Sequence, residues 1–422
     1  MPAKKKVILK LKKFWQILGP GLITGASDDD PSGIATYSQA GAQFGLSTLW
    51  TAFITFPLMA SIQEMCARIG IITSMGLTGT LKKNYPRPIL YLMVIFSFPA
   101  IVLNIGADIA GMGAVANLIF PGIHTIYFSI AFTTMLMVAI IYFPYQKIAS
   151  ILKYLCLLLL VYLIIPFLSK QDWQLIFKKT FVPTLHLNKE FITILVAVLG
   201  TTISPYLFFW QATMEVEEMK HGKKHLIVNN NLIHKMKVDV NFGMLFSNIV
   251  MFFIILTTGT VLFNQGIYQI DTVEQAAKAL EPLAGEGAYY LFAIGVIGTG
   301  FLAIPVLSGS LSYIISETFG WEEGLDKKFH EAKPFYIVII ISLLIGLGIN
   351  YIGISPIQAL IYSAILYGLT SPVIIAIVLH IANNRSVMKE FTNGKWSNTL
   401  GVITLLFMTL AAMIMLYYQF IA

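Results

Sequence analysis

Three consecutive aspartates occur inside the first long apolar stretch of the chain, residues 15–43. Asp28, Asp29 and Asp30 are followed directly by Pro31. Each charge at the centre of a membrane-spanning helix costs roughly 2.5–3.5 kcal/mol on insertion scales, which excludes a regular helix that faces lipid here. Such a sequence is tolerated where the backbone is unwound and lines a polar cavity. The aspartates therefore predict a break in the first spanning helix.

A second interruption lies in the sixth apolar stretch, residues 190–217. It contains Thr201, Ser204, Pro205 and Tyr206. Proline inside a helix removes a backbone hydrogen bond and leaves carbonyl oxygens free. The two interrupted spans are five apart, so they occupy matching places in two inverted halves. Such a pair of broken helices indicates the binding site of a secondary transporter.

The donor atoms at the two breaks are oxygens of carboxylates, hydroxyls and free carbonyls. These hard ligands suit Mg²⁺, Ca²⁺ or Mn²⁺. Neither a histidine nor a methionine occurs at either break in the sequence. Neighbouring residues of a helix point about 100° apart, so the three aspartates are not expected to face one ion together. For Asp28 and Asp29, a role as metal ligands and a role as protonated or vestibule-lining groups both stay open.

A membrane domain must hold these residues in place. Hydrophobic residues make up 57% of the 422 positions and charged residues 12%, which excludes a soluble domain. We expect an all-α polytopic membrane protein with about eleven transmembrane helices. The predicted spans are residues 15–43, 47–71, 88–119, 123–143, 147–168, 190–217, 238–263, 287–317, 334–351, 355–383 and 397–420.

The basic residues predict how these spans are oriented. If the N-terminus is cytoplasmic, the outer segments hold only Lys170, Lys178, Lys179, Lys189 and Lys278, and the other basic residues outside the spans lie inside. This asymmetry follows the positive-inside rule. It also accounts for the net charge of +7 without a nucleic-acid partner. We expect a multi-pass protein of the plasma (inner) membrane.

The spans divide the chain into five parts. We expect a basic cytoplasmic N-terminus (1–13), a first repeat (14–170), an extracellular loop (171–189), a second repeat (190–384) and a last span (385–422). Cys66 and Cys156 lie in apolar segments without zinc-site spacing, so they are interpreted as packing residues.

Several other polar residues lie within the apolar spans. Glu64 and Arg68 are four residues apart in the order that favours a helical ion pair. Asp108 is interpreted either as a relay residue or as a cavity-lining residue. Amide side chains in spans favour hydrogen bonds between helices, which we expect for Gln39, Gln211 and Asn248.

The first break resembles the first helix of the Nramp divalent metal transporters. The resemblance rests on Gly19-Pro20-Gly21, Asp30-Pro31-Ser32-Gly33 and the tract from Gln39 to Gly45, and it continues in Ala67–Gly70, Ala107–Ala110, Leu280–Leu283 and Asn384–Met388. It implies a LeuT-like 5+5 inverted repeat with broken helices 1 and 6, and transport by alternating access.

The sequence departs from the family pattern at several places. Gly33 occupies the position of the usual binding-site asparagine. The usual Ala-x-x-Met-Pro-His motif is replaced by Thr201, Ser204, Pro205 and Tyr206, which removes the thioether that favours softer metals. The family glutamate of span 3 and glutamine of span 10 correspond to Gly111 and Ala364.

By this resemblance we expect one metal site between the two breaks. The predicted site residues are Asp30, Gly33, Thr201, Ser204 and Tyr206, with Asp28 and Asp29 as further candidates. A roomier, all-oxygen site suits a small ion that keeps several waters, which resembles the Nramp-related magnesium transporter branch.

The predicted activity is therefore uptake of Mg²⁺, and also of Mn²⁺, into the cytoplasm without proton coupling. The expected partners are the divalent ion and the lipid bilayer; no cofactor and no enzymatic activity are expected, and no oligomer is implied. One alternative is a proton-coupled Mn²⁺/Fe²⁺ transporter of the ordinary Nramp kind. The other is an amino-acid transporter of the same fold, although three aspartates would repel a substrate carboxylate.

Overall fold

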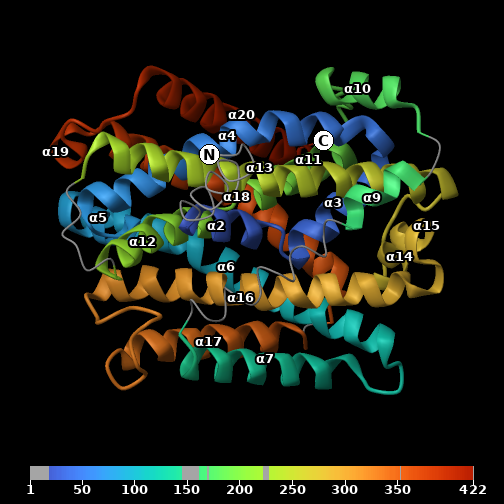
Figure 1. Ribbon diagram of the computed structural model, residues 1–422, viewed down its shortest axis with the longest axis horizontal. Helices are drawn as coiled ribbons and strands as arrows, with labels where there is room; N and C mark the ends of the chain where they lie inside the picture. Colours follow the sequence, from blue (N-terminus) through green and yellow to red (C-terminus); the bar gives the residue numbers. More distant parts are fainter. Residues whose placement is uncertain (1–18, 145–160, 169–170, 222–227, 352, 422) are drawn as a thin grey trace, which may run out of the picture.

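The computed structural model describes residues 19–144, 161–168, 171–221, 228–351 and 353–421, and every regular element in these residues is a helix. Most of the long helices run in roughly one direction, side by side (Figure 1). Eight helical segments in the described residues are long and apolar enough to cross a membrane, which agrees with a polytopic membrane protein. The count of eleven spans stays a prediction, because most of span 147–168 and all of segment 1–13 lie outside the described residues, as does Cys156.

The first half of the chain supplies four predicted spans almost completely. Its helices are α2 (Pro20–Asp28), α3 (Pro31–Phe44), η1 (Gly45–Thr48), α4 (Leu49–Thr73), α5 (Leu77–Asn84), α6 (Arg87–Ile119), α7 (Thr125–Tyr142), α9 (Val161–Leu168) and α10 (Trp173–Phe181). The helices α2 and α3 together form the first predicted span, and α4, α6 and α7 form the next three.

The second half repeats this plan with a second divided span, which consists of α11 and α12. Its helices are α11 (Lys189–Thr202), α12 (Pro205–His221), α13 (Asn230–Val261), η3 (Phe263–Gln265), α14 (Val273–Ala277), η4 (Lys278–Leu280), α15 (Glu281–Ala284), η5 (Gly285–Gly287), α16 (Ala288–Phe319), α17 (Lys333–Ile349), α18 (Pro356–Asn383), α19 (Arg385–Met388) and α20 (Lys395–Phe420).

Both predicted helix breaks are confirmed. Between α2 and α3, Asp29 has φ −84° and ψ 52°, and Asp30 is extended with φ −72° and ψ 172°. Between α11 and α12, Ile203 has φ −110° and ψ 61°. In each case a proline begins the second helix, where its missing N–H costs no helical hydrogen bond.

Small residues let the broken helices approach their neighbours closely. A Cβ atom added at Gly25 of α2 would lie 2.1 Å from the Gly243 carbonyl oxygen of α13. A Cβ atom added at Gly70 of α4 would lie 2.1 Å from the Ala212 carbonyl oxygen of α12. Exchanging span 1 with span 6, and span 2 with span 7, converts the first pair into the second. Two inverted repeats would produce this pairing. The boundaries of the repeats, at 14–170 and 190–384, stay a prediction.

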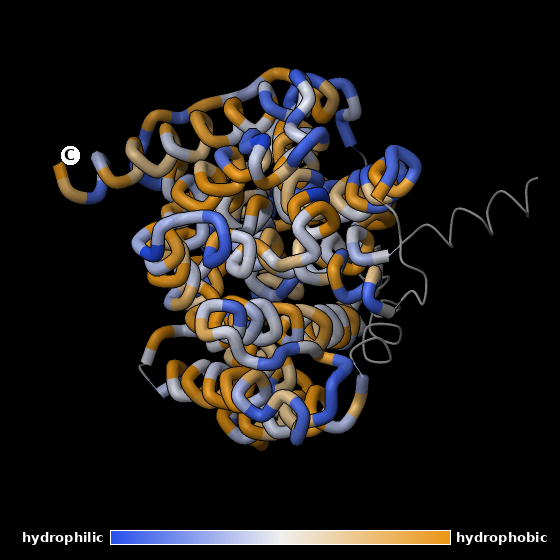
Figure 2. Tube along the Cα trace, turned by 90° about the vertical axis from the view of Figure 1, so that its left-hand side faces the viewer, coloured by the Kyte–Doolittle hydropathy of each residue, from blue (hydrophilic) through white to orange (hydrophobic). Residues whose placement is uncertain are grey.

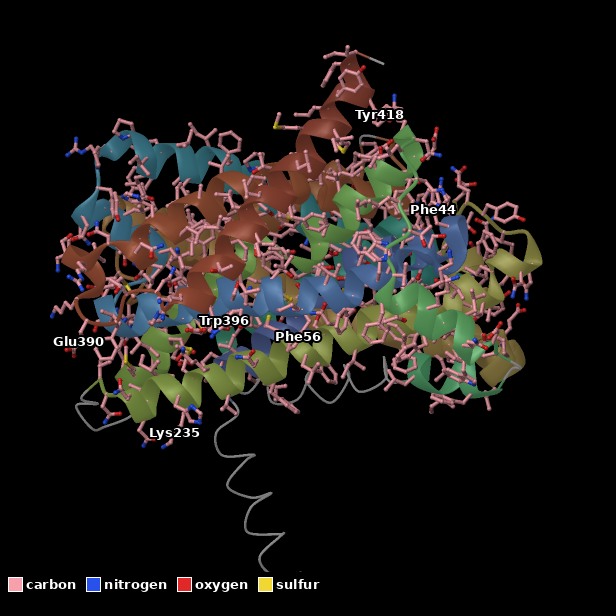
Figure 3. All side chains as sticks on the ribbon, turned by 90° about the horizontal axis from the view of Figure 1, so that it is seen from above. Phe44, Phe56, Lys235, Glu390, Trp396 and Tyr418 are labelled. Carbon is pink, nitrogen blue, oxygen red and sulfur yellow. The ribbon has the colours of Figure 1, made fainter. Side chains whose placement is uncertain are left out.

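The molecule has two ends, which we call the α5 end and the α10 end. The α5 end carries α5, α19 and the last turns of α12 and α16; the α10 end carries α10, α14 and α15 (Figure 1, left and right). Viewed from the α5 end, hydrophilic residues gather in connections between largely apolar helices (Figure 2). Exposed apolar side chains such as Met135, Ile345 and Leu406 lie on α7, α17 and α20, and α20 lies at the outside of the molecule (Figure 3). These surfaces suit contact with lipid.

Candidate functional site

The two helix breaks lie against each other in the interior. The Tyr206 hydroxyl of α12 donates a hydrogen bond of 3.0 Å to the Ser27 carbonyl oxygen of α2. The hydroxyls of Tyr37 in α3 and Thr202 in α11 are 3.0 Å apart. All four residues are buried. Each half of the first broken helix is therefore bonded to one half of the second.

Asp30 is the N-cap of α3. Its Oδ1 accepts a 2.6 Å hydrogen bond from the Gly33 N–H, and its Oδ2 accepts one of 2.9 Å from Nδ2 of Asn104 in α6. A carboxylate at a helix N-terminus satisfies free N–H groups and interacts favourably with the helix dipole. Only 2% of Asp30 is exposed, so the structure holds this carboxylate in a fixed place away from water.

Asp28 and Asp29 face a different helix. The Ser247 hydroxyl of α13 lies 2.6 Å from Oδ2 of Asp28 and 3.4 Å from Oδ1 of Asp29. The other oxygen of each carboxylate is buried without a hydrogen-bond partner. The three aspartates are thus directed to two helices, α13 and α6. Among the described residues, no group of three His, Cys, Asp or Glu side chains is arranged to hold a metal ion.

The predicted residues of the second break provide backbone oxygens and packing. The Ser204 hydroxyl donates to the carbonyl oxygens of Gly200 and Thr201, at 3.0 and 2.5 Å, so it serves its own helix. Thr201 is buried beside it. A Cβ atom at Gly33 would lie 3.1 Å from the Asp28 carbonyl oxygen, which makes this position tight. The predicted site residues therefore all lie at the two breaks.

Sequence reasoning missed two side chains that touch the Asp30 network. Asn104 donates to Asp30, and its Oδ1 accepts a 2.8 Å hydrogen bond from Ser363 of α18. The available signal for Asn104 was an amide one helical turn before Asp108 in an apolar span. The signal for Ser363 was weaker, because the family pattern drew attention to the neighbouring Ala364.

Two family positions on α6 have distinct surroundings. The buried Asp108 carboxylate lies near Asp30 and the backbone N–H of Ser32. A Cβ atom at Gly111 would lie 3.2 Å from a methyl group of Leu360. A glutamate at position 111 would therefore require Leu360 to move. Asp108 is thus buried beside Asp30, and both interpretations, as a relay residue and as a cavity-lining residue, stay predictions.

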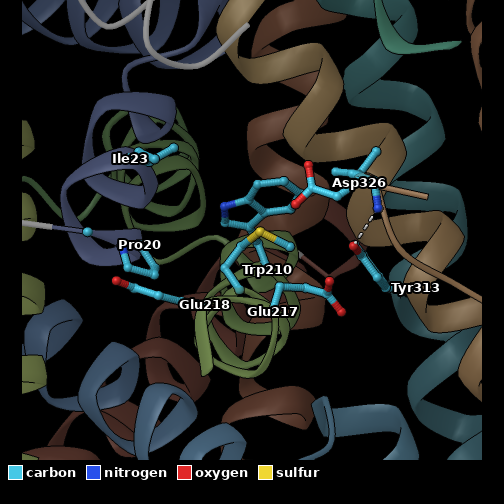
Figure 4. Close-up of a pocket in the computed structure, with 10 residues that line it drawn as sticks. Pro20, Ile23, Trp210, Glu217, Glu218, Tyr313 and Asp326 are labelled. Atoms are coloured by element: carbon cyan, nitrogen blue, oxygen red, sulfur yellow. Dashed lines mark hydrogen bonds between the residues drawn. The ribbon is translucent and has the colours of Figure 1, made fainter. Parts of the chain in front are cut away.

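A cavity of about 220 Å³ opens at the α5 end, between α2, α12 and the end of α16. Glu217, Glu218 and Asp326 stand around Trp210 in this cavity (Figure 4). Ile23 and Trp210 line it. Ile23 lies one helical turn, about 6 Å, before Ser27, and Trp210 lies one turn after Tyr206. The cavity thus ends about one turn from the breaks, and its acidic rim would attract cations.

A second cavity of about 580 Å³ lies at the same end, beside α5. Glu317 of α16 accepts 2.8 Å hydrogen bonds from the N–H groups of Gly76 and Gly79, which joins α16 to the start of α5. Burial and the neighbouring Glu317 raise the pKa of Glu323 to about 8, against the opposing effect of Lys220. The α5 end therefore combines carboxylates and lysines in close contact.

The predicted polar pairs within the spans are largely confirmed. Arg68 lies 3.4 Å from Glu64, and Lys237 of α13 lies 3.1 Å from the same carboxylate. Gln211 and Asn248 bond between helices, where their oxygens accept from the hydroxyls of Thr24 and Thr55 at 2.6 and 2.8 Å. Gln39 instead bonds the connection before α14, through a 2.8 Å hydrogen bond from the Ile270 N–H.

The chain is similar to known membrane proteins along almost its whole length. The family model described as Nramp, natural resistance-associated macrophage protein-like, matches residues 21–418. A protein of Caldanaerobacter subterraneus named divalent metal cation transporter MntH is 25% identical, over 97% of this chain and 94% of that protein. The protein of the same name from Clostridium acetobutylicum is also 25% identical, over 98% and 93%.

Solved structures resemble the fold. The manganese transporter of Eremococcus coleocola, in complex with an aromatic bis-isothiourea compound, has a TM-score of 0.74 at 17% identity, over 97% of this chain and 87% of that chain. The inward-facing conformation of Mhp1 has a TM-score of 0.52 at 11% identity, over 95% and 91%. These likenesses show a LeuT-like fold.

Proposed function

The chain belongs to the Nramp-like family, and we propose that it is a secondary transporter that carries divalent metal ions by alternating access. The observation that carries this proposal is the buried Asp30 carboxylate at the meeting point of two helix breaks. No lysine or arginine in the described part of the chain forms an ion pair with it. A buried carboxylate without a counter-charge favours a bound cation.

The oxygen-only donor set supports Mg²⁺ as the preferred ion, with Mn²⁺ also carried. Asp30, the hydroxyl of Thr201 and the carbonyl oxygens at the breaks are hard ligands. Ser204 occupies the place of the family methionine, and its hydroxyl is bonded to its own helix. Among the described residues, the predicted ligands themselves include no soft donor that would favour Mn²⁺ or Fe²⁺ over Mg²⁺; the nearby thioether of Met251 lies 3.6 Å from the Thr202 hydroxyl. We assign Gly33 and Tyr206 to shaping the site, and leave Asp28 and Asp29 as further metal-attracting groups.

A proton-coupled Mn²⁺ transporter is the second candidate. Its support comes from similar proteins that are named MntH and from the structurally similar manganese transporter of Eremococcus coleocola. Against it stand the replacements at Ser204, Tyr206 and Gly111. These remove one soft ligand and two groups that could titrate near neutral pH in the family pattern.

The charges at the two ends of the molecule support an orientation in the membrane. We propose that the α5 end faces the cytoplasm, because it carries Lys82, Lys83, Lys220, Lys327 and Arg385. With this orientation the N-terminus is cytoplasmic, and the acidic cavity beside Trp210 is the inner mouth. An ion released from Asp30 would leave along the seam between α2 and α12.

Ion flux into liposomes tests both candidates. The purified full chain is reconstituted, and uptake of Mg²⁺, Mn²⁺ and Ca²⁺ is measured with and without a pH gradient, with protein-free liposomes as the control. We expect Mg²⁺ uptake that competes with Mn²⁺ and does not require a pH gradient. Mn²⁺ uptake that Mg²⁺ cannot inhibit would favour the second candidate, and a chain that moves none of these ions would contradict both.

A further inference from the structure

The Asn104 amide lies between two residues that fix both of its ends. Its Nδ2 donates to Oδ2 of Asp30 at 2.9 Å, and its Oδ1 accepts from the Ser363 hydroxyl at 2.8 Å. An ionised carboxylate accepts hydrogen bonds and cannot donate them, so the NH₂ group must be the end that faces Asp30. All three side chains are buried. The orientation of this amide is therefore determined by its partners.

The hydrogen bonds continue until they return to the first broken helix. The hydroxyls of Ser363 and Ser32 are 3.0 Å apart. Because the Ser363 proton is donated to Asn104, Ser32 is the donor of this bond, and the Leu360 carbonyl oxygen at 2.7 Å is its alternative acceptor. Ser32 lies two residues after Asp30 on the first turn of α3. The resulting ring connects α3 with α6 and α18, and it includes Asp30.

This ring limits what Asp30 can offer to an ion. A carboxylate has about four lone-pair sites. Two of them are occupied in Asp30 by the N–H groups of Gly33 and Asn104. These charge-assisted bonds draw negative charge away from the carboxylate. An ion that keeps its waters needs less direct charge from Asp30 than an ion that sheds them, and Mg²⁺ loses water reluctantly.

We propose that Asn104 is a specificity-determining positioning residue, which with Ser363 holds Asp30 so that the site prefers a hydrated divalent ion. This inference rests on the proposed transport function and adds the residues that select the ion. The family asparagine on the first helix is absent at Gly33. An amide instead reaches the carboxylate from α6, where it contacts Asp30 as a hydrogen-bond donor.

The chain contains a matched control for this amide. Asn248 of α13 is also buried and also connects two helices, through the 2.8 Å bond that it accepts from Thr55 of α4. Its NH₂ group donates to the Met244 carbonyl oxygen at 2.9 Å within its own helix. Truncation of Asn248 therefore removes a comparable interhelical bond without changing the partners of Asp30.

The test compares Asn104→Ala, Ser363→Ala and Asn248→Ala in the full chain, reconstituted in liposomes. KM and the maximal rate are measured for Mg²⁺ and Mn²⁺ separately. For Asn104→Ala we expect the KM for Mg²⁺ to rise about tenfold, because Asp30 loses the bond that holds it in the position suited to the hydrated ion. The KM for Mn²⁺ should rise less, and the maximal rate should change less than KM. Ser363→Ala should also raise the KM for Mg²⁺ more than the KM for Mn²⁺, by smaller factors than Asn104→Ala.

The control variant should retain the wild-type ratio of the two KM values, whatever its effect on thermal stability. An Asn104→Ala protein that elutes as a single species and keeps the wild-type KM values and ratio would overturn the inference. So would an Asn248→Ala protein that reproduces the change in ratio. If Asn104→Ala does not fold, an unchanged ratio in Ser363→Ala overturns the inference. A wild-type chain that moves neither ion overturns the proposed function instead.

Discussion

The two helix breaks supply different chemistry to the same region. The break between α2 and α3 contains three carboxylates, and Asp30 is presented by the cap of α3 and by Asn104. The break between α11 and α12 contains no charged residue. Its hydroxyls bond back to their own helix, as Ser204 does to Gly200 and Thr202 does to Val198.

This difference separates the attraction of an ion from the choice of an ion. A divalent cation interacts most strongly with charge, and only the first break provides it. The second break provides carbonyl oxygens and the Tyr206 bond to the first break. We therefore expect loss of the Asp30 charge to abolish transport, and changes at the second break, like changes in the partners of Asp30, to alter its selectivity.

The largest effect is expected for Asp30→Ala, which leaves the helix break but removes the buried charge. Removal of one partner from a buried charge pair weakens binding by roughly 100-fold or more, and we expect a loss of ion uptake of the same order. The measurement is initial Mg²⁺ uptake into liposomes at matched protein content. A variant that is folded and still transports at the wild-type rate would place the site elsewhere.

Asp28→Asn sharpens the comparison within the first break. Asparagine keeps an oxygen that can accept the Ser247 hydrogen bond. We expect a smaller loss of uptake than for Asp30→Ala, because Asp28 faces α13. An equal loss in both variants would show that the ion is shared between the two carboxylates.

The sequence predicted the architecture because the relevant signals are local. Long apolar runs, a proline and three aspartates inside one span and a proline inside another are sufficient to predict membrane helices and both breaks. Asp30 was also identified correctly as a residue of the break. The hydrogen bond from the Gly33 N–H to Asp30 follows from the usual N-cap geometry of an aspartate.

The partners of the aspartates depend on contacts between distant parts of the chain. Asn104 lies 74 residues from Asp30, and Ser247 lies 219 residues from Asp28. A spanning helix presents polar residues at several heights and angles, so composition cannot tell which of them meets a given carboxylate. For the same reason, the separation of Asp28 and Asp29 from Asp30 required the positions of α13 and α6.

A moderate effect is expected from Ser204→Met combined with Gly33→Asn. The two changes restore a soft ligand at the second break and an amide at the first, and should shift competition from Mg²⁺ toward Mn²⁺ or Cd²⁺ by about tenfold. The asparagine must fit near the Asp28 carbonyl oxygen, because a Cβ atom at position 33 would lie only 3.1 Å from it. Ser204→Met alone is therefore the control for crowding, and an unchanged ion ranking in both would show that these positions do not face the ion.

A smaller effect is expected from Tyr206→Phe, which removes the hydrogen bond between the two breaks and keeps the aromatic side chain. A neutral hydrogen bond contributes about 0.5–1.5 kcal/mol, so we expect a change of roughly two- to tenfold in KM. The affected group is the Ser27 carbonyl oxygen, which loses its donor. Initial uptake at several Mg²⁺ concentrations measures this change, and a loss as large as that of Asp30→Ala would contradict the division of roles between the breaks.

The last prediction is that metal uptake moves no protons. In the family pattern the second break carries a histidine and span 3 carries a glutamate; here Tyr206 and Gly111 occupy these places, and neither residue type titrates near neutral pH. A doubly charged ion gains about 4.6 kcal/mol per 100 mV of inside-negative potential, so uptake needs no proton gradient. The measurement uses liposomes that contain a pH-sensitive dye, with metal added outside and a protonophore-treated sample as the control. Acidification that scales with metal flux would contradict uncoupled uptake and assign proton movement to Asp28, Asp29 or Asp108.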